Sequence, residues 1–303
     1  MRHVLHLLDF SPEELHQLLV EACHLKAARQ RRIHTPSLMG RVLSLVFEKP
    51  SLRTRVSFQS AIAQLGGASL FLSGKEAGLG CRESLPDVAR TISQYVDAVV
   101  LRTFSQDTIE EFAQHAECPV INGLSNLYHP CQALSDVFTV KEIFGDLAGR
   151  TITFVGDGNN VARSLAIACG KLGIKLILAA PKEFQFDDTF LKILKTHVPQ
   201  VELEQSEDLR KAVKSADIIY TDVWTSMGQE AEENERKNRL ASYQVNAELL
   251  ALAPTHARVM HCLPAKRGEE ITSEVLDGDQ SVVFQQAANR MHAQKALLFW
   301  LMK

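Results

Sequence analysis

Two arginines lie two residues apart in the segment FEKPSLRTRVSF (47–58), directly after a predicted buried strand. The proline–serine pair before them fits the start of a helix, whose first backbone N–H groups point into the preceding loop. A helix dipole disfavours positive charge at that end, so Arg53 and Arg55 indicate either solvated charges or a bound anion. Together with the hydroxyl groups of Ser51 and Thr54, this segment would form a cradle suited to a phosphate.

Two histidine motifs follow other apolar runs. HPCQ (129–132) places His129 and Gln132 one helical turn apart, where both can donate hydrogen bonds to a carbonyl oxygen or an oxyanion, unless the histidine is structural. HCLP (261–264) places Cys262 at the end of a predicted strand, as a chemically active thiol or a small buried apolar residue. The spacing of these histidines and cysteines matches no usual zinc site, so no metal is expected.

Two further motifs offer polar groups for a ligand. GDGNNV (156–161) follows a strand and opens a helix, but Val161 replaces the third glycine of GxGxxG and no acid follows to bind a ribose. A dinucleotide site is therefore disfavoured, and Asn160 either binds another polar ligand or belongs to a tight turn. In TDVWTSMG (221–228), Asp222 could bind an amine or cap a helix.

The composition is typical of a globular enzyme rather than a membrane or nucleic-acid-binding protein. Of 303 residues, 46% are hydrophobic and 23% charged, and the net charge of -3 gives no electrostatic attraction to nucleic acid or anionic lipid. No apolar run approaches the roughly 18 residues that span a bilayer. The N-terminus does not resemble a signal peptide. Six cysteines without a CxxC pair indicate reduced thiols, so we expect a cytoplasmic protein. Because GDGNN fits a dinucleotide poorly, we expect no cofactor.

Nine apolar runs alternate with helical patterns along the chain. Runs that are apolar throughout are typical of parallel sheets covered on both faces, and their alternation with helices predicts βαβ units. The predicted strands are 41–47, 68–73, 97–104, 118–124, 150–156, 174–180, 216–224, 257–263 and 280–286. We therefore predict an α/β fold with two doubly wound parallel-sheet domains. The active site is expected in the cleft between them, since ligands of such sheets bind at the carboxyl ends of the strands.

Six motifs together resemble those of the ornithine carbamoyltransferase family, over essentially the whole chain: SLRTR, LRTF, HPCQ, GDGNN, DVWTSMG and HCLP, in this order. The aspartate carbamoyltransferases resemble the first half alone, whereas HCLP and SMG point to ornithine. The resemblance implies transfer of a carbamoyl group from carbamoyl phosphate to the δ-amine of L-ornithine, giving L-citrulline and phosphate, as in arginine biosynthesis. It also implies a homotrimer with active sites at subunit interfaces.

The resemblance assigns each substrate mainly to one domain, with Cys262 and Leu263 of the second domain also contacting carbamoyl phosphate. Residues 1–135, completed by a C-terminal helix over 287–303, would bind carbamoyl phosphate, and residues 136–286 would bind ornithine. The carbamoyl phosphate ligands would be Ser51, Leu52, Arg53, Thr54, Arg102, His129, Gln132, Cys262, Leu263 and Arg290. The ornithine ligands would be Asn160, Asp222, Ser226 and Met227. Cys262, Arg102 and His129 would be catalytic, with Cys262 handling a proton beside the reacting amine.

The sequence departs from the family pattern at two places. Leu52 stands where relatives usually have threonine, so one hydroxyl group is lost while the backbone N–H remains. Gly78 stands where many relatives have a glutamine or histidine that reaches the phosphate of a neighbouring subunit, a contact that Lys75 or Arg82 could replace. Arg55 is expected to support the cradle from behind.

Three alternative functions are compatible with parts of this pattern. A sibling carbamoyltransferase could act on a modified ornithine or putrescine. A nicotinamide oxidoreductase would bind NAD(H), and a catalytically silent relative would only bind ligands. An assay of ureido products across several amines separates the first from ornithine transfer.

Overall fold

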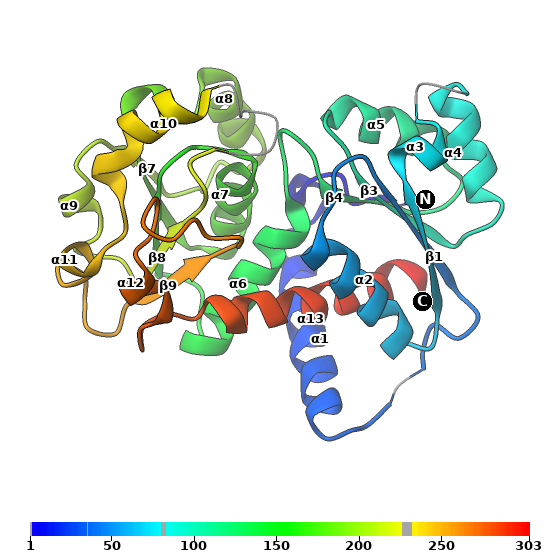
Figure 1. The fold of residues 1–303 in the computed structure, drawn as a ribbon. Helices are drawn as coiled ribbons and strands as arrows, with labels where there is room; N and C mark the ends of the chain where they lie inside the picture. Colours follow the sequence, from blue (N-terminus) through cyan, green and yellow to red (C-terminus); the bar gives the residue numbers. More distant parts are fainter. Residues whose placement is uncertain (1, 35, 80–82, 226–231) are drawn as a thin grey trace. The chain divides into compact units, whose positions relative to one another are not determined.

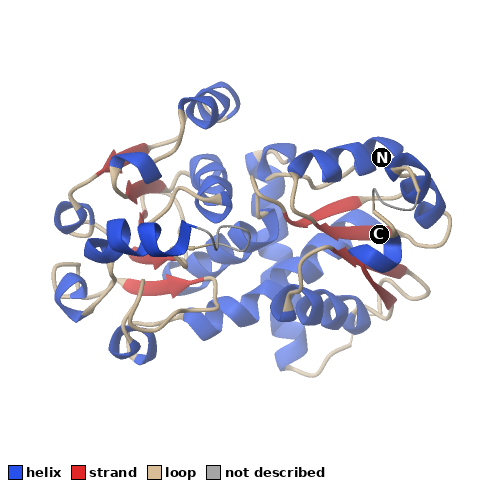
Figure 2. Ribbon diagram, turned by 45° about the horizontal axis from the view of Figure 1, so that its top comes forward, coloured by secondary structure: helices blue, strands red, loops and turns tan. Residues whose placement is uncertain are grey.

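The computed structural model describes residues 2–34, 36–79, 83–225 and 232–303. The chain divides into two compact units: unit 1 comprises Met1–Phe138 and Ala288–Lys303, and unit 2 comprises Thr139–Ala287. Each unit contains one parallel β-sheet flanked by helices (Figure 2). Within the described residues, no helix is long and apolar enough to cross a membrane.

Unit 1 is built on four parallel strands in the order β2-β1-β3-β4 (Figure 1). They are β1 (Val42–Phe47), β2 (Ala68–Ser73), β3 (Ala98–Arg102) and β4 (Val120–Leu124). The side chains of β3 and most of those of β1 and β4 are buried, as expected for a parallel sheet with two covered faces. The helices are η1 (Leu7–Asp9), α1 (Pro12–Gln30), α2 (Leu52–Gln64), α3 (Gly74–Ala77), α4 (Leu85–Ser93) and α5 (Gln106–His115). Two more, α6 (Pro130–Phe144) and α13 (Val283–Met302), belong partly to each unit.

Helix α1 begins with the capping box that its sequence predicts. The Ser11 hydroxyl accepts a hydrogen bond of 3.2 Å from the backbone N–H of Glu14, and the Glu14 carboxylate accepts one of 2.8 Å from the backbone N–H of Ser11. Pro12 occupies the first helical position, where no backbone N–H is needed. The sequence SPEEL (11–15) thus carries a helix start signal, with a serine N-cap, a proline at the first position and a glutamate at the third.

Unit 2 contains five parallel strands in the order β7-β6-β5-β8-β9. They are β5 (Thr151–Val155), β6 (Lys175–Ala179), β7 (Leu203–Ser206), β8 (Ile218–Thr221) and β9 (Arg258–His261). The helices are α7 (Asn160–Leu172), η2 (Lys182–Phe184), α8 (Asp188–His197), α9 (Leu209–Ala212), α10 (Glu233–Leu240), η4 (Ala241–Tyr243), α11 (Ala247–Leu250) and α12 (Ser273–Asp277). The prediction of an α/β fold with two parallel, doubly wound sheets is confirmed.

Two details of the strand prediction were wrong. Strand β7 was missed because its residues, LEQS, are half-buried at the edge of the sheet and form no apolar run. The predicted strand 280–286 makes only an isolated bridge, between Ser281 and Val259 of β9. From Val283 onward the chain is helical, because the FQQAANRM segment consists mainly of residues that favour helices and continues into the buried part of α13.

Candidate active site

The motif residues follow the carboxyl ends of parallel strands in both units. In unit 1 the order of the strands reverses between β1 and β3, and in unit 2 between β5 and β8. Loops leaving two such strands diverge to opposite sides, which opens a place for a ligand. The cradle segment follows β1, Arg102 ends β3, GDGNN follows β5 and Asp222 follows β8. Each unit therefore carries polar side chains at the place where the order of its strands reverses.

The cradle segment forms the first turn of α2. Ser51 is the N-cap residue, and its hydroxyl oxygen accepts a hydrogen bond of 3.2 Å from the backbone N–H of Thr54. This bond leaves the Ser51 hydroxyl hydrogen available to a ligand. Thr54 is buried and Arg53 half-buried, whereas the Leu52 side chain is 76% exposed. Leu52 can therefore offer its backbone N–H at the helix start while its side chain projects into solvent.

Three arginines of unit 1 influence the imidazole of His129. Burial lowers the pKa of His129 well below its usual range, and the positive charges of Arg290, Arg102 and Arg53 lower it further. Arg102 and Arg290 are themselves buried. The imidazole is consequently neutral at physiological pH, and the surrounding guanidinium groups favour an anion at this place.

Arg290 connects helix α13 to two of the predicted ligands. Its Nη1 group donates to Oε1 of Gln132, and its Nη2 group donates to Oγ1 of Thr54 at 2.9 Å. Thr54 and Gln132 lie on different helices, α2 and α6. The structure thus brings together residues 158 and 236 positions apart in the sequence.

Arg55 and Gly78 each have a local structural role in unit 1. Arg55 lies over the ring of Phe71 on β2, with its guanidinium carbon 3.7 Å from the ring centroid, and its Nε donates to Gln59. This contact gives Arg55 a packing role on β2. Gly78 ends α3 with φ 67°, a left-handed conformation that favours glycine. Arg82 lies outside the described residues, and Lys75 is exposed.

Cys131 of the HPCQ motif is a packing residue. Its thiol is buried and donates a weak hydrogen bond of 3.4 Å to the backbone oxygen of Asn122. Burial raises the pKa of Cys131 to about 12. It remains protonated at physiological pH and is a poor nucleophile and a poor metal ligand.

In unit 2, the Asp222 carboxylate accepts hydrogen bonds from two strand-end loops. Its Oδ1 accepts from Sγ of Cys262 at 2.9 Å, and its Oδ2 accepts from Nδ2 of Asn159 at 2.9 Å. The Asn159 side chain also caps α7, since its Oδ1 accepts from the backbone N–H groups of Val161 and Ala162. The GDGNN motif offers Asn159 as well as Asn160 as a polar group, and the resemblance assigned ornithine binding to Asn160 alone.

The backbone at Cys262 is held by a buried histidine. Nδ1 of His261 accepts a hydrogen bond of 2.9 Å from the backbone N–H of Leu263, and its Nε2 faces Oε1 of Glu270 at 3.0 Å. His261 and Glu270 are fully buried. Leu263 has φ 55°, a conformation unfavourable for a branched side chain, and precedes a cis peptide bond to Pro264. The bond from Leu263 to His261 stabilises this turn beside the thiol.

The ligand atoms of Asp222, His261 and Cys262 lie within 4.8 Å of one another and could in principle hold a metal ion. Both nitrogens of His261 already form hydrogen bonds, and the Cys262 thiol already donates to Asp222. A metal would have to replace these bonds. The expectation that the protein needs no metal remains a prediction.

Arg236 is a site-supporting residue that sequence analysis missed. It is buried on α10, where its Nε donates to the backbone oxygen of Trp224 at 2.7 Å and its Nη2 pairs with Asp157. It thereby joins the loops that follow β5 and β8. Burial raises the pKa of Asp157, an effect that the Arg236 charge opposes. Most residues beside Arg236 in the sequence are charged or polar, and only the fold shows that the Arg236 side chain turns inward.

The remaining predicted ornithine ligands are placed only in part. Asn160 is the first residue of α7 and is half-buried. Ser226 and Met227 lie outside the described residues.

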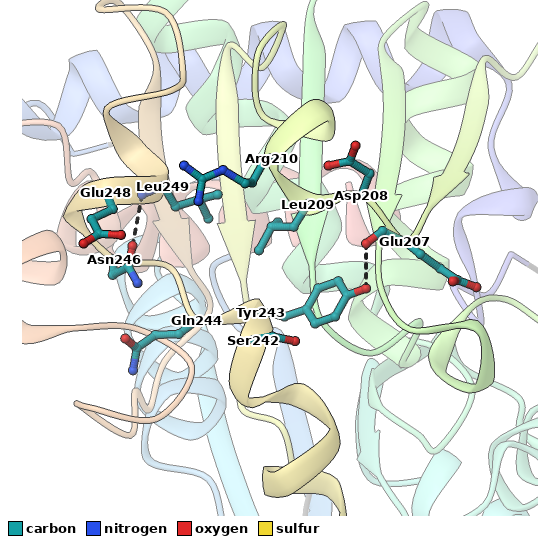
Figure 3. A pocket seen from close by; sticks show the side chains of 10 residues that line it. All are labelled: Glu207, Asp208, Leu209, Arg210, Ser242, Tyr243, Gln244, Asn246, Glu248 and Leu249. Atoms are coloured by element: carbon teal, nitrogen blue, oxygen red, sulfur yellow. Dashed lines mark hydrogen bonds between the residues drawn. The ribbon is translucent and has the colours of Figure 1, made fainter.

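A cavity of about 330 Å³ lies elsewhere in unit 2 (Figure 3). It is lined by Glu207, Asp208, Leu209, Arg210, Ser242, Tyr243, Gln244, Asn246, Glu248 and Leu249. Two of these side chains already form hydrogen bonds with backbone groups. The Tyr243 hydroxyl donates to the Glu207 carbonyl at 2.8 Å, and Asn246 caps α11. Among the predicted site residues that the structure describes, none lines this cavity.

Comparison with known proteins gives matches over the whole chain. Residues 2–142 match the family model for the aspartate/ornithine carbamoyltransferase carbamoyl-P binding domain, and residues 148–301 match that for the Asp/Orn binding domain. The chain is 50% identical over 299 residues to an ornithine carbamoyltransferase of Bacillus subtilis, covering 98% of this chain and 92% of the relative. It is 46% identical over 302 residues to that of Archaeoglobus fulgidus, covering 100% and 98%. The structure of ornithine carbamoyltransferase from Pyrococcus furiosus is similar with a TM-score of 0.96 and 44% identity, covering 99% of this chain and 97% of that one.

Proposed function

Since the chain belongs to the aspartate/ornithine carbamoyltransferase family, we propose that it transfers the carbamoyl group of carbamoyl phosphate to the δ-amine of L-ornithine. The products are L-citrulline and phosphate. The observation that carries this proposal is the influence of three arginines on one neutral histidine, at the strand ends of the unit that resembles a carbamoyl phosphate-binding domain.

Unit 1 binds carbamoyl phosphate in this proposal. The phosphate accepts hydrogen bonds from the first turn of α2, from the hydroxyls of Ser51 and Thr54 and from the guanidinium of Arg53. The carbamoyl oxygen accepts from Arg102 and His129. Because the low pKa of His129 keeps its ring neutral, the ring acts as a hydrogen-bond donor without adding a fourth positive charge.

Unit 2 binds ornithine through Asn160 and Asp222, together with the residues of the SMG motif. The δ-amine is mostly protonated at neutral pH and must lose a proton before it attacks. Cys262 lies beside this amine and passes the proton on. The support for this role is its hydrogen bond to Asp222, which orients the thiol and joins it to a carboxylate.

The reaction then proceeds without a covalent enzyme intermediate. The lone pair of the neutral amine attacks the carbamoyl carbon, and the carbonyl electrons move to the oxygen, where Arg102 and His129 donate hydrogen bonds. When the carbonyl re-forms, the C–O bond to phosphate breaks and the electron pair leaves with the phosphate. The guanidinium of Arg53 stabilises the phosphate as it leaves, and the departing phosphate takes the remaining extra proton of the amine nitrogen.

The assembly and location follow the resemblance. We infer a cytoplasmic homotrimer in which the active sites lie at subunit interfaces. Light scattering of the purified protein tests the assembly, since a monomeric active enzyme would contradict it.

A colorimetric assay for ureido products tests the reaction. Purified protein is incubated with carbamoyl phosphate and, in separate samples, ornithine, acetylornithine, putrescine, lysine or aspartate. We expect product with ornithine and little with the others. Product with another amine and none with ornithine would replace the proposed substrate, and absence of product with every amine would contradict transferase activity.

A further inference from the structure

The carboxylate of Asp136 lies one helical turn beyond Gln132 on α6 and is fully buried. Its Oδ1 accepts a hydrogen bond of 2.8 Å from Nε2 of Gln132. Gln132 in turn accepts from Arg290, and Arg290 donates to Thr54 at 2.9 Å. A continuous row of hydrogen bonds therefore runs from Asp136 to the first turn of α2.

Burial makes this carboxylate unusual within unit 1. Among the described residues of that unit, Asp136 is the one acidic side chain in the buried class, which also includes the cations Lys49, Arg102, Arg290 and Lys295. A buried charge is costly unless other charges and hydrogen bonds compensate it. The carboxyl group of Asp136 lies near Arg290, with the single amide of Gln132 between them.

The row also has a fixed direction. A guanidinium only donates hydrogen bonds, so the Gln132 amide must turn its Oε1 to Arg290, and its Nε2 then donates to Asp136. A guanidinium only donates, so the oxygen of Thr54 must be the acceptor at the last step. The hydroxyl hydrogen of Thr54 is then available to donate to a ligand oxygen.

We propose that Asp136 is a positioning residue for carbamoyl phosphate binding. It sets the orientation of the Gln132 amide and, through Arg290, directs the Thr54 hydroxyl hydrogen to the ligand. This inference rests on the proposed function for the identity of the ligand. If Asp136 did not hold Gln132, the amide could rotate and present its NH₂ group to Arg290, where two donors would face each other.

Two substitutions test the proposal by ligand binding, measured independently of turnover. Asp136→Leu removes the acceptor, and Asp136→Asn keeps the shape but can present either a donor or an acceptor. Val137→Ala is the matched control, because Val137 is buried on the same helix but lies outside the row. Calorimetric titration with carbamoyl phosphate and with inorganic phosphate gives Kd, steady-state assays give both KM values, and thermal unfolding monitors the fold.

Loss of a residue that orients a ligand-binding group typically weakens binding about 10- to 100-fold. We expect Asp136→Leu to weaken carbamoyl phosphate binding by this factor, and Asp136→Asn to weaken it less, by at least about threefold. KM for ornithine should stay within about twofold in both, because Asp136 and its row lie in the other substrate's unit. Val137→Ala should lower the melting temperature with Kd unchanged.

Several outcomes overturn the proposal. Unchanged carbamoyl phosphate binding in folded Asp136→Leu would show that Asp136 is only structural, as would a lower melting temperature with unaltered Kd. Should Asp136→Leu fail to fold, an unchanged Kd in Asp136→Asn decides against the proposal. A wild-type protein that binds carbamoyl phosphate but forms no citrulline would contradict the proposed function instead, while the binding comparison would still test Asp136.

Discussion

The thiol of Cys262 donates a hydrogen bond of 2.9 Å to Oδ1 of Asp222, although the two residues are 40 positions apart. Each follows the last residue of a neighbouring parallel strand, Cys262 after β9 and Asp222 after β8. The register of the sheet pairs Thr221 with His261, so the two strand ends are level. Adjacent strands that end at the same height place the next residues side by side.

This pair predicts a difference between two substitutions of Cys262. Cys262→Ser keeps a donor to Asp222, whereas Cys262→Ala leaves the carboxylate without that bond, at a cost of about 1.5–3 kcal/mol for a bond to a charged group. We expect Cys262→Ala to reduce kcat/KM for ornithine about 10- to 100-fold, and Cys262→Ser to retain more activity. Kinetics at saturating carbamoyl phosphate measure this. Equal losses in the two variants would show that the donor to Asp222 does not matter.

The two arginines of the cradle segment should differ sharply in importance. Arg53 lowers the pKa of His129 by its charge, whereas Arg55 lies over the Phe71 ring. We expect Arg53→Ala to reduce kcat/KM for carbamoyl phosphate by about 100-fold or more, because a charged donor to the leaving phosphate is lost. Arg55→Ala is the matched control, with a stability loss of about 0.5–1 kcal/mol and KM within about twofold. Similar kinetic losses in both variants would contradict this division.

Acid should destabilise the protein through His129. Its folded-state pKa lies well below the unfolded value, so the unfolded chain binds a proton first as the pH falls. The stability linked to the neutral ring is complete above the unfolded pKa of about 6.5 and is lost progressively as the pH falls toward the folded pKa. Urea unfolding of wild type and His129→Gln between about pH 5 and pH 7.5 isolates this contribution. As the pH is lowered, the free energy of unfolding of wild type should decrease relative to that of the variant. A difference that stays constant across this pH range would contradict the prediction.

Thiol reagents should distinguish Cys131 from Cys262. Cys131 is buried with its pKa raised to about 12, whereas Cys262 is partly exposed. Because the thiolate is the reactive form, iodoacetamide at neutral pH should modify Cys262 and leave Cys131 intact in the folded protein. Peptide mapping by mass spectrometry measures both sites, with urea-unfolded protein as the control. Rapid modification of Cys131 in the folded protein would contradict its buried, protonated state.

Local patterns were sufficient for much of the fold. The apolar runs predicted the strands of both sheet centres, since a central parallel strand must be apolar on both faces. Strand β7 escaped because an edge strand is only half covered, so LEQS needs no apolar run. The 280–286 run was misassigned because a short apolar run has no clear period, and its helical continuation decided the outcome.

By itself, the sequence determined the α/β class, the two sheets and the motifs at the strand ends, because these depend on periodicity and on residues close together in the chain. The tertiary structure decided which distant groups meet. Arg290 reaches Thr54 and Gln132, Asp136 sets the direction of that row, and Arg236 turns inward from a charged helix. Such contacts depend on packing and burial. A charged residue has the same sequence signature whether it faces solvent or a buried partner.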